Sequence, residues 1–203
     1  MSRLVCIVEG DGEVEALPVL LRRMIEESGR FDVKVSRPLR TRRDRFLRRD
    51  EEMKKMLGYA ALQAREGGCI LVLLDADNDC IAELVAQHKT QIETLAAGIA
   101  CSLVVAKSEF ESWFIAAAES LRGYRNLPED LQCPADPEAI RDAKGWLRQR
   151  MTQPGAAYSE TIDQPAFAHQ FDWRIARTRA PSLDKLCRDM ARLLDISALR
   201  EGA

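Results

Sequence analysis

Three short apolar runs stand out along the chain, and each of them ends in charged residues. They are RLVCIV at residues 3–8, CILVLLD at 69–75 and CSLVVA at 101–106. Runs of this length that are rich in valine, isoleucine and leucine are typical of buried strands. The pattern therefore predicts three central strands of a sheet.

Helical spacing of apolar residues separates these runs. The first helix is expected over about 15–28, because Pro18 is tolerated only in a first turn, and Ser28 with Gly29 should end it. A further strand is expected over 31–39. Helices are expected over about 50–66, 80–97 and 138–151, and another should follow the third apolar run and end near Leu121. Ser182 should be the N-terminal cap of a last helix.

Alternation of buried strands with helices is the signature of an α/β protein with a mainly parallel sheet flanked by helices. We expect residues 1–122 to form this Rossmann-like domain. Residues 123–137 contain three prolines and little periodicity, so a linker is expected there. Residues 138–203 should form a helical C-terminal appendage that packs on the first domain.

Carboxylates follow all three predicted strands. In a parallel sheet the carboxyl ends of the strands share one edge, so these acids should meet there. Carboxylates brought close together repel one another unless divalent cations neutralise them, and ligation by oxygen alone selects Mg²⁺ or Mn²⁺. The residues concerned are Glu9 and Glu13 after the first strand, Asp75, Asp77 and Asp79 after the second, and Glu109 and Glu111, with Lys107, after the third.

Local patterns refine this expectation. In an extended Asp75-Ala76-Asp77 segment the two carboxylates would point the same way and could share one ion. Gly10 and Gly12 would let the backbone turn sharply after Glu9 and admit a phosphate.

Each acid also has an interpretation that needs no metal. Glu13 and Glu15 could favour a helix N-terminus, Asp79 could cap a helix, and Glu109 with Glu111 could begin a solvated helix.

Composition narrows the other possibilities. The six cysteines form no C-x-x-C pair and the chain has two histidines, which argues against a structural zinc site and a disulfide framework. No apolar run reaches the roughly 20 residues of a membrane helix, and no leader sequence is recognisable, so a cytoplasmic protein is expected.

Charge is distributed unevenly although the formal net charge is only -2. Seven arginines lie within residues 37–49, and arginine binds phosphate through two donors at once. We expect this run to contact a nucleic-acid backbone, although it could instead be a solvated loop, pair with acidic residues 50–52 or bind a partner protein. The candidate phosphate contacts are Arg40, Arg42, Arg43, Arg45 and Lys107.

The segments VEGDGE and LLDADND resemble the hallmarks of the Toprim domain, a metal-binding α/β module of topoisomerases, primases and OLD-type nucleases. This resemblance covers about residues 1–120. The stretches SEFESWF, KGWL and APSLDKLCRDM resemble more narrowly the small stand-alone Toprim-like proteins of the DUF4276 family, which are similar to nuclease partners of ATPases in phage defence.

The resemblance implies particular roles for the acids. Glu9, Asp75 and Asp77 would be catalytic metal ligands, while Glu13 and Glu111 would be additional ligands. Glu109 could replace Glu111, and Glu9 could bridge to the metal or act as a general base.

The function that the resemblance favours is an Mg²⁺- or Mn²⁺-dependent endonuclease, acting on DNA rather than RNA, in a bacterial anti-phage system. The chain has no phosphate-binding loop of the G-x-x-x-x-G-K-[ST] type, so any ATP requirement would come from a partner ATPase. No other cofactor is implied. The alternatives are a non-catalytic docking or regulatory subunit of an ATPase complex and another phosphoryl-processing enzyme.

Overall fold

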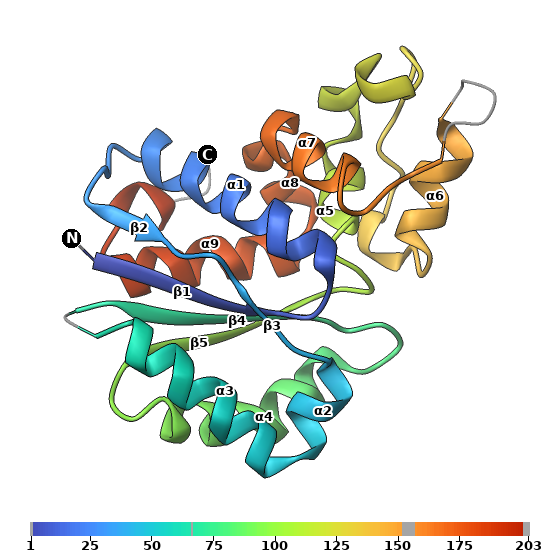
Figure 1. Cartoon of the computed structure of the whole chain (residues 1–203). Coiled ribbons are helices and arrows are strands. Elements are labelled where there is room, and N and C mark those ends of the chain that lie inside the picture. Colours follow the sequence, from blue (N-terminus) through green and yellow to red (C-terminus); the bar gives the residue numbers. More distant parts are fainter. Residues whose placement is uncertain (1, 66, 152–156, 201–203) are drawn as a thin grey trace.

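A single mainly parallel sheet lies between two layers of helices (Figure 1). The structure is a computed structural model, and it describes residues 2–65, 67–151 and 157–200. The strand order is β2-β1-β4-β5, and every pairing is parallel. The predicted α/β class is therefore confirmed. The strands are β1 (Ser2–Val8), β2 (Val33–Val35), β3 (Leu39–Arg40), β4 (Cys69–Asp75) and β5 (Ala100–Ala106).

The three central strands coincide with the three apolar runs and end at one edge of the sheet. Asp75 at the end of β4 pairs with Ala106 at the end of β5, and Ile7 near the end of β1 pairs with Val72. The segment expected as one strand over 31–39 is instead two short strands, and both pair with β1.

Each face of the sheet packs against its own set of helices. Side chains alternate along β1, so Cys6 and Val8 enter one core, whereas Val5 and Ile7 enter the other. The second core lies under the helices α2 (Arg43–Arg48), α3 (Asp50–Gln63) and α4 (Ile81–Leu95). The first core lies under the other described helices, which are α1 (Asp11–Glu27), α5 (Ser112–Ala116), α6 (Ala143–Arg150), α7 (Asp163–Gln170), α8 (Trp173–Arg179) and α9 (Pro181–Leu194).

Helix α1 begins earlier than the sequence suggested. It starts at Asp11 and contains Pro18 in its interior, so the prediction of a start near Glu15 is wrong. Proline cannot donate a backbone hydrogen bond to Val14 four residues earlier. Pro18 is buried, and packing of α1 against the sheet compensates for the missing bond. The predicted end is confirmed, because Ser28 is the C-terminal cap and Gly29 has a φ of 76°.

Other helix boundaries also differ from expectation. Helix α2 lies inside the arginine run, where no helix was predicted, and it buries Phe46. The helix expected up to Leu121 is the short α5 followed by a 3₁₀ turn. Ser182 lies inside α9 and does not cap it; its hydroxyl accepts a 2.7 Å hydrogen bond from the Trp113 indole. The 3₁₀ turns are η1 (Ala118–Leu121), η2 (Tyr124–Asn126), η3 (Pro137–Ala139) and η4 (Ser197–Leu199).

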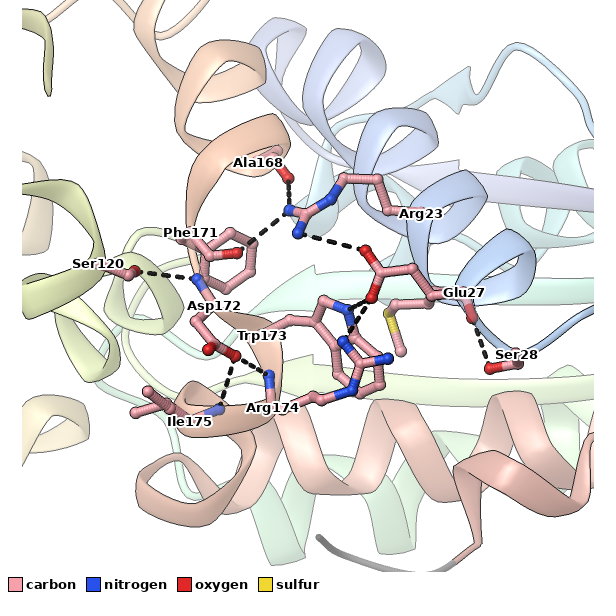
Figure 2. A network of polar contacts seen from close by, with 11 residues as sticks. Arg23, Glu27, Ser28, Ser120, Ala168, Phe171, Asp172, Trp173, Arg174 and Ile175 are labelled. Atoms are coloured by element: carbon pink, nitrogen blue, oxygen red, sulfur yellow. Dashed lines mark hydrogen bonds and ion pairs between the residues drawn. The ribbon is translucent and has the colours of Figure 1, made fainter.

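The C-terminal helices share one core with the sheet and α1. Figure 2 shows polar contacts that join these parts around the end of α1. Arg23 of α1 donates to the carbonyl oxygens of Ala168 at 2.8 Å and Phe171 at 3.1 Å. Glu27 accepts a 3.0 Å hydrogen bond from the Trp173 indole at the start of α8. Apolar packing and specific hydrogen bonds thus fix the C-terminal region to the first half of the chain.

Within the described parts of the chain, no helix is both long and apolar enough to cross a membrane.

Candidate metal centre

Three buried carboxylates form what we call the inner acid cluster, at the carboxyl edge of the sheet. Asp75 ends β4, Glu13 lies in the first turn of α1, and Glu111 immediately precedes α5. Their exposed fractions are 8%, 4% and 0%. Asp75 continues the row of Leu71 and Leu73, which faces the α1 side of the sheet. The chain topology therefore brings together acids that are distant in sequence, as the strand pattern predicted.

Burial raises the pKa of every carboxyl group in the inner acid cluster. The pKa of Asp75 lies well above its ordinary value, because of burial and then because of the charges of Glu13 and Glu111. Burial raises the pKa of Glu111 to about 8, with Lys144 opposing the shift and Glu13 adding to it. Burial also raises the pKa of Glu13. The cluster is unfavourable in its fully ionised form unless a cation is added.

Three carboxylate oxygen atoms near the carboxyl edge of the sheet are buried without a hydrogen-bond partner. Glu13 Oε2 and Glu111 Oε2 are buried and accept no hydrogen bond, and the same holds for Oε2 of Glu9. Carboxylate oxygens are the ligands that Mg²⁺ and Mn²⁺ prefer, so the donor set fits these ions. As the side chains stand, however, no three His, Cys, Asp or Glu residues in the described ranges form a ready ligand group. For these acids to bind one ion together, their side chains would have to change conformation.

Lys144 of α6 supplies a positive charge to this region. Its ammonium nitrogen lies 3.8 Å from Glu109 Oε1 and 3.4 Å from Glu160 Oε1. Burial lowers the pKa of Lys144, but Glu111, Glu160, Glu109 and Asp75 together raise it above its ordinary value. Lys144 thus acts as an internal counter-ion of the acids.

Glu109 and Glu111 have different surroundings. Glu109 Oε2 accepts a 3.1 Å hydrogen bond from the backbone amide of Lys144, so this acid is engaged with α6. One oxygen of Glu111 is also engaged, because Oε1 accepts from the Tyr158 hydroxyl at 2.9 Å and from the Gln164 amide at 3.2 Å. The second oxygen, Oε2, is left without a partner. Glu111 is therefore the better placed ligand of the two.

Asp77 belongs to a second group, centred on Arg43 of α2. Arg43 Nη1 lies 2.9 Å from Asp77 Oδ2, and Nη2 pairs with Asp79. Strand β4 ends at Asp75, and Asp77 has a φ of 50°. The prediction that Asp75 and Asp77 project side by side from an extended strand is wrong, because the backbone turns between them.

Glu9 lies between the two groups. It continues the row of Val5 and Ile7 on the α2 side of the sheet. Its pKa is raised by burial first and by the charge of Asp77, whereas the Arg43 guanidinium opposes the shift. The charge of Glu13 raises the pKa of Glu9 further, so charges of both the inner acid cluster and the Arg43 group act on Glu9.

The two glycines after β1 provide space rather than a turn. Gly10 has an extended conformation, with φ −98° and ψ 163°. A Cβ atom at Gly10 would lie 2.2 Å from Glu13 Oε2, and one at Gly12 would lie 2.0 Å from Gln164 Oε1. Both glycines therefore let the α1 backbone approach polar side chains of the site closely.

The basic residues expected to contact nucleic acid have different environments. Arg43 is buried and paired, so in this arrangement its guanidinium is directed at Asp77 and Asp79. Arg40 pairs with Asp11 at 3.0 Å on the surface. Arg42 and Arg45 are exposed, and neither forms an ion pair within the described residues. Lys107 is half-buried after β5.

Sequence reasoning missed three residues of the site: Lys144, Tyr158 and Gln164. Lys144 lies in the KGWL stretch, and no motif of the sequence analysis includes Tyr158 or Gln164. In a segment without hydrophobic periodicity, the sequence around a polar residue does not indicate which carboxylate that residue will contact in the folded protein.

Comparison with known proteins gives one match. The family model described as "Domain of unknown function (DUF4276)" matches residues 8–191. No curated protein and no solved structure matches the chain. The match includes β2 to β5, the inner acid cluster, the Arg43 group and α6 to α8, so the chain belongs to the DUF4276 family.

Proposed function

We propose that this protein is a divalent-metal-dependent endonuclease of Toprim-like, OLD-nuclease-like character that hydrolyses phosphodiester bonds, in DNA rather than RNA. The observation that carries the proposal is the inner acid cluster, with buried carboxylate oxygens that accept no hydrogen bond. A buried set of ionisable acids with strongly raised pKa values is typical of a site with a chemical role.

The residues of the site have complementary tasks in this proposal. Glu13, Asp75 and Glu111 would hold Mg²⁺ or Mn²⁺, with Glu9 and Asp77 as further ligands from the Arg43 side. When bound, the ions would supply Lewis-acid activation of water and would neutralise the charge developing at the phosphate.

The surrounding side chains prepare the acids for binding. Tyr158 and Gln164 hold one oxygen of Glu111 and leave the other available. Lys144 balances part of the negative charge until an ion binds. The exposed Arg42 and Arg45 remain candidates for contact with the nucleic-acid backbone.

An ATPase partner and a place in anti-phage defence are the wider part of the proposal. The Toprim-like motifs VEGDGE and LLDADND support them by resemblance, and because the sequence has no phosphate-binding loop, any ATP requirement would be met by the partner.

The test combines a cleavage assay with a binding assay. Plasmid, single-stranded DNA and RNA are incubated with the protein and Mg²⁺ or Mn²⁺, then with EDTA, each with and without a candidate ATPase. We expect metal-dependent cleavage that Asp75→Asn and Glu111→Gln abolish and that Glu26→Gln, at an exposed position of α1, retains.

Calorimetric titration with Mn²⁺ provides the second readout. We expect binding to wild type and to Glu26→Gln, and loss of binding in Asp75→Asn. Folded wild type that neither binds Mn²⁺ nor cleaves any substrate would overturn the proposal and favour a docking subunit.

A further inference from the structure

A cavity opens at the carboxyl edge of the sheet, beside Asp77 of the Arg43 group. Its volume is about 220 Å³. The loop after β4, the loop after β5 and the segment around η3 line it. Asp77 forms part of its wall, together with Asn78, Lys107, Ser108, Glu138 and Arg141.

The wall of this cavity carries two cations and two carboxylates. Burial raises the pKa of Glu138, and the charge of Lys107 opposes this rise. Within the described residues, neither Lys107 nor Arg141 forms an ion pair, although both line the cavity. The two carboxylates of the wall are held by other groups. Asp77 pairs with Arg43, and Glu138 Oε1 accepts hydrogen bonds from the backbone amide and the hydroxyl of Ser182.

The polar atoms available in the cavity are chiefly donors. The Lys107 ammonium and the Arg141 guanidinium carry only donors, and the Asn78 amide can donate as well. Ser108 is less available, because its hydroxyl donates to the Glu138 carbonyl at 3.4 Å. Positively charged donors of this kind, converging on a small cavity, recognise phosphate oxygens.

We propose that this cavity binds a phosphate group of a nucleic acid, with Lys107 and Arg141 as its principal contacts. Because Asp77 lines the cavity and pairs with Arg43, a phosphate bound there would lie beside Asp77, which the proposed function makes a further metal ligand. This inference adds a phosphate-binding site to the proposed nuclease function. The position of that phosphate relative to the cleaved bond rests on the proposed function. Phosphate binding itself requires neither metal nor cleavage.

The experiment measures binding of a fluorescent single-stranded DNA oligonucleotide in EDTA over a series of salt concentrations. Arg141→Gln and Lys107→Gln are each expected to weaken binding about tenfold, because each removes a charge-assisted contact. Each should also reduce the slope of log affinity against log salt by about 0.7, the value for one phosphate contact on a single strand.

Matched variants separate a local contact from a general loss of charge. Arg148→Gln removes an exposed arginine of α6 outside the cavity, and it should leave affinity and slope within error of wild type. Arg141→Lys should recover most of the affinity. If Arg141→Gln and Lys107→Gln bind as Arg148→Gln does, the proposal is overturned.

Oligonucleotides with and without a 5′-phosphate identify the source of the phosphate. If both lose affinity equally in Arg141→Gln, the cavity takes an internal phosphodiester. If only the phosphorylated one does, it takes a terminal phosphate. If DNA binding depends on Arg141 but no substrate is cleaved in the presence of metal, the proposed nuclease function is wrong and the proposed phosphate-binding site still stands.

Discussion

Tyr158 donates a 2.9 Å hydrogen bond to Oε1 of Glu111, and both side chains are buried. This bond joins the segment before α7 to the residue that precedes α5. It satisfies one oxygen of a carboxyl group that has no access to water.

Tyr158→Phe tests how much this hydrogen bond contributes to the stability of the folded protein. Removing the hydroxyl deprives Glu111 of a buried donor, so the free energy of unfolding should fall by about 1–3 kcal/mol. Denaturant unfolding measures the change. Tyr59→Phe is the control, since Tyr59 is 55% exposed on α3. Equal stability of the two variants would show that the bond contributes nothing.

The pH dependence of stability should reveal the raised pKa of Glu111. Burial raises this pKa to about 8 in the folded protein, from 4.5 when the chain is unfolded. The folded state then binds more protons than the unfolded state between these values. Without metal, the free energy of unfolding should therefore decrease as pH rises from about 4.5 to about 8.

Glu111→Gln should reduce this slope, because an amide does not titrate in this range. At pH 8 without metal the variant should be more stable than wild type by on the order of 4 kcal/mol. Glu26→Gln should keep the wild-type slope. A wild-type stability curve that rises over this interval would contradict the assignment.

Lys144→Met should make the protein more dependent on divalent cations. Without metal the substitution leaves Glu109, Glu111 and Asp75 without their counter-ion, and stability should fall by roughly 1–2 kcal/mol. Added Mn²⁺ replaces the missing positive charge, so it should raise the melting temperature more in the variant than in wild type.

Lys89→Met is the matched control for this prediction, because Lys89 pairs with Glu93 on the exposed surface of α4. Its response to Mn²⁺ should equal that of wild type. A smaller Mn²⁺ response in Lys144→Met than in wild type would mean that the ammonium does not compete with the metal.

Gly12→Ala should be destabilising by about 1–3 kcal/mol, since the new Cβ atom would lie 2.0 Å from Gln164 Oε1 and 3.1 Å from Glu160 Cβ. Gly58→Ala in α3 has no atom within 4 Å of the new methyl group. It should stabilise the protein by about 0.5–1 kcal/mol. Thermal unfolding of both variants checks the opposite signs, and a shared sign would refute the close approach at Gly12.

The sheet could be predicted from sequence because its central strands are buried on both faces. Residues 4–8 and 69–74 are continuously apolar, and a strand with this pattern cannot have a solvent-exposed face. Helix α2 was missed because Phe46 is its only large side chain in the core, among arginines that suggest a loop. Ser182 was misassigned because its partners, Trp113 and Glu138, lie far away in sequence.

The acids of the candidate site were predictable for a topological reason. Glu9 and Asp75 follow parallel strands, so the sheet itself brings them to one edge. The separation into an inner acid cluster and an Arg43 group was not predictable, since it depends on the turn at Asp77 and on the burial of Arg43. Lys144 reaches the acids only through the tertiary placement of α6.

Assembly of the site has a consequence for the protein during its synthesis. Glu13 and Asp75 emerge early from the ribosome, whereas Lys144, Tyr158 and Gln164 follow about 70 or more residues later. Until those side chains dock, the carboxylates stay hydrated and mobile. A nascent chain therefore carries Glu13 and Asp75 before it can form the inner acid cluster, because the cluster needs side chains that are synthesised after α6.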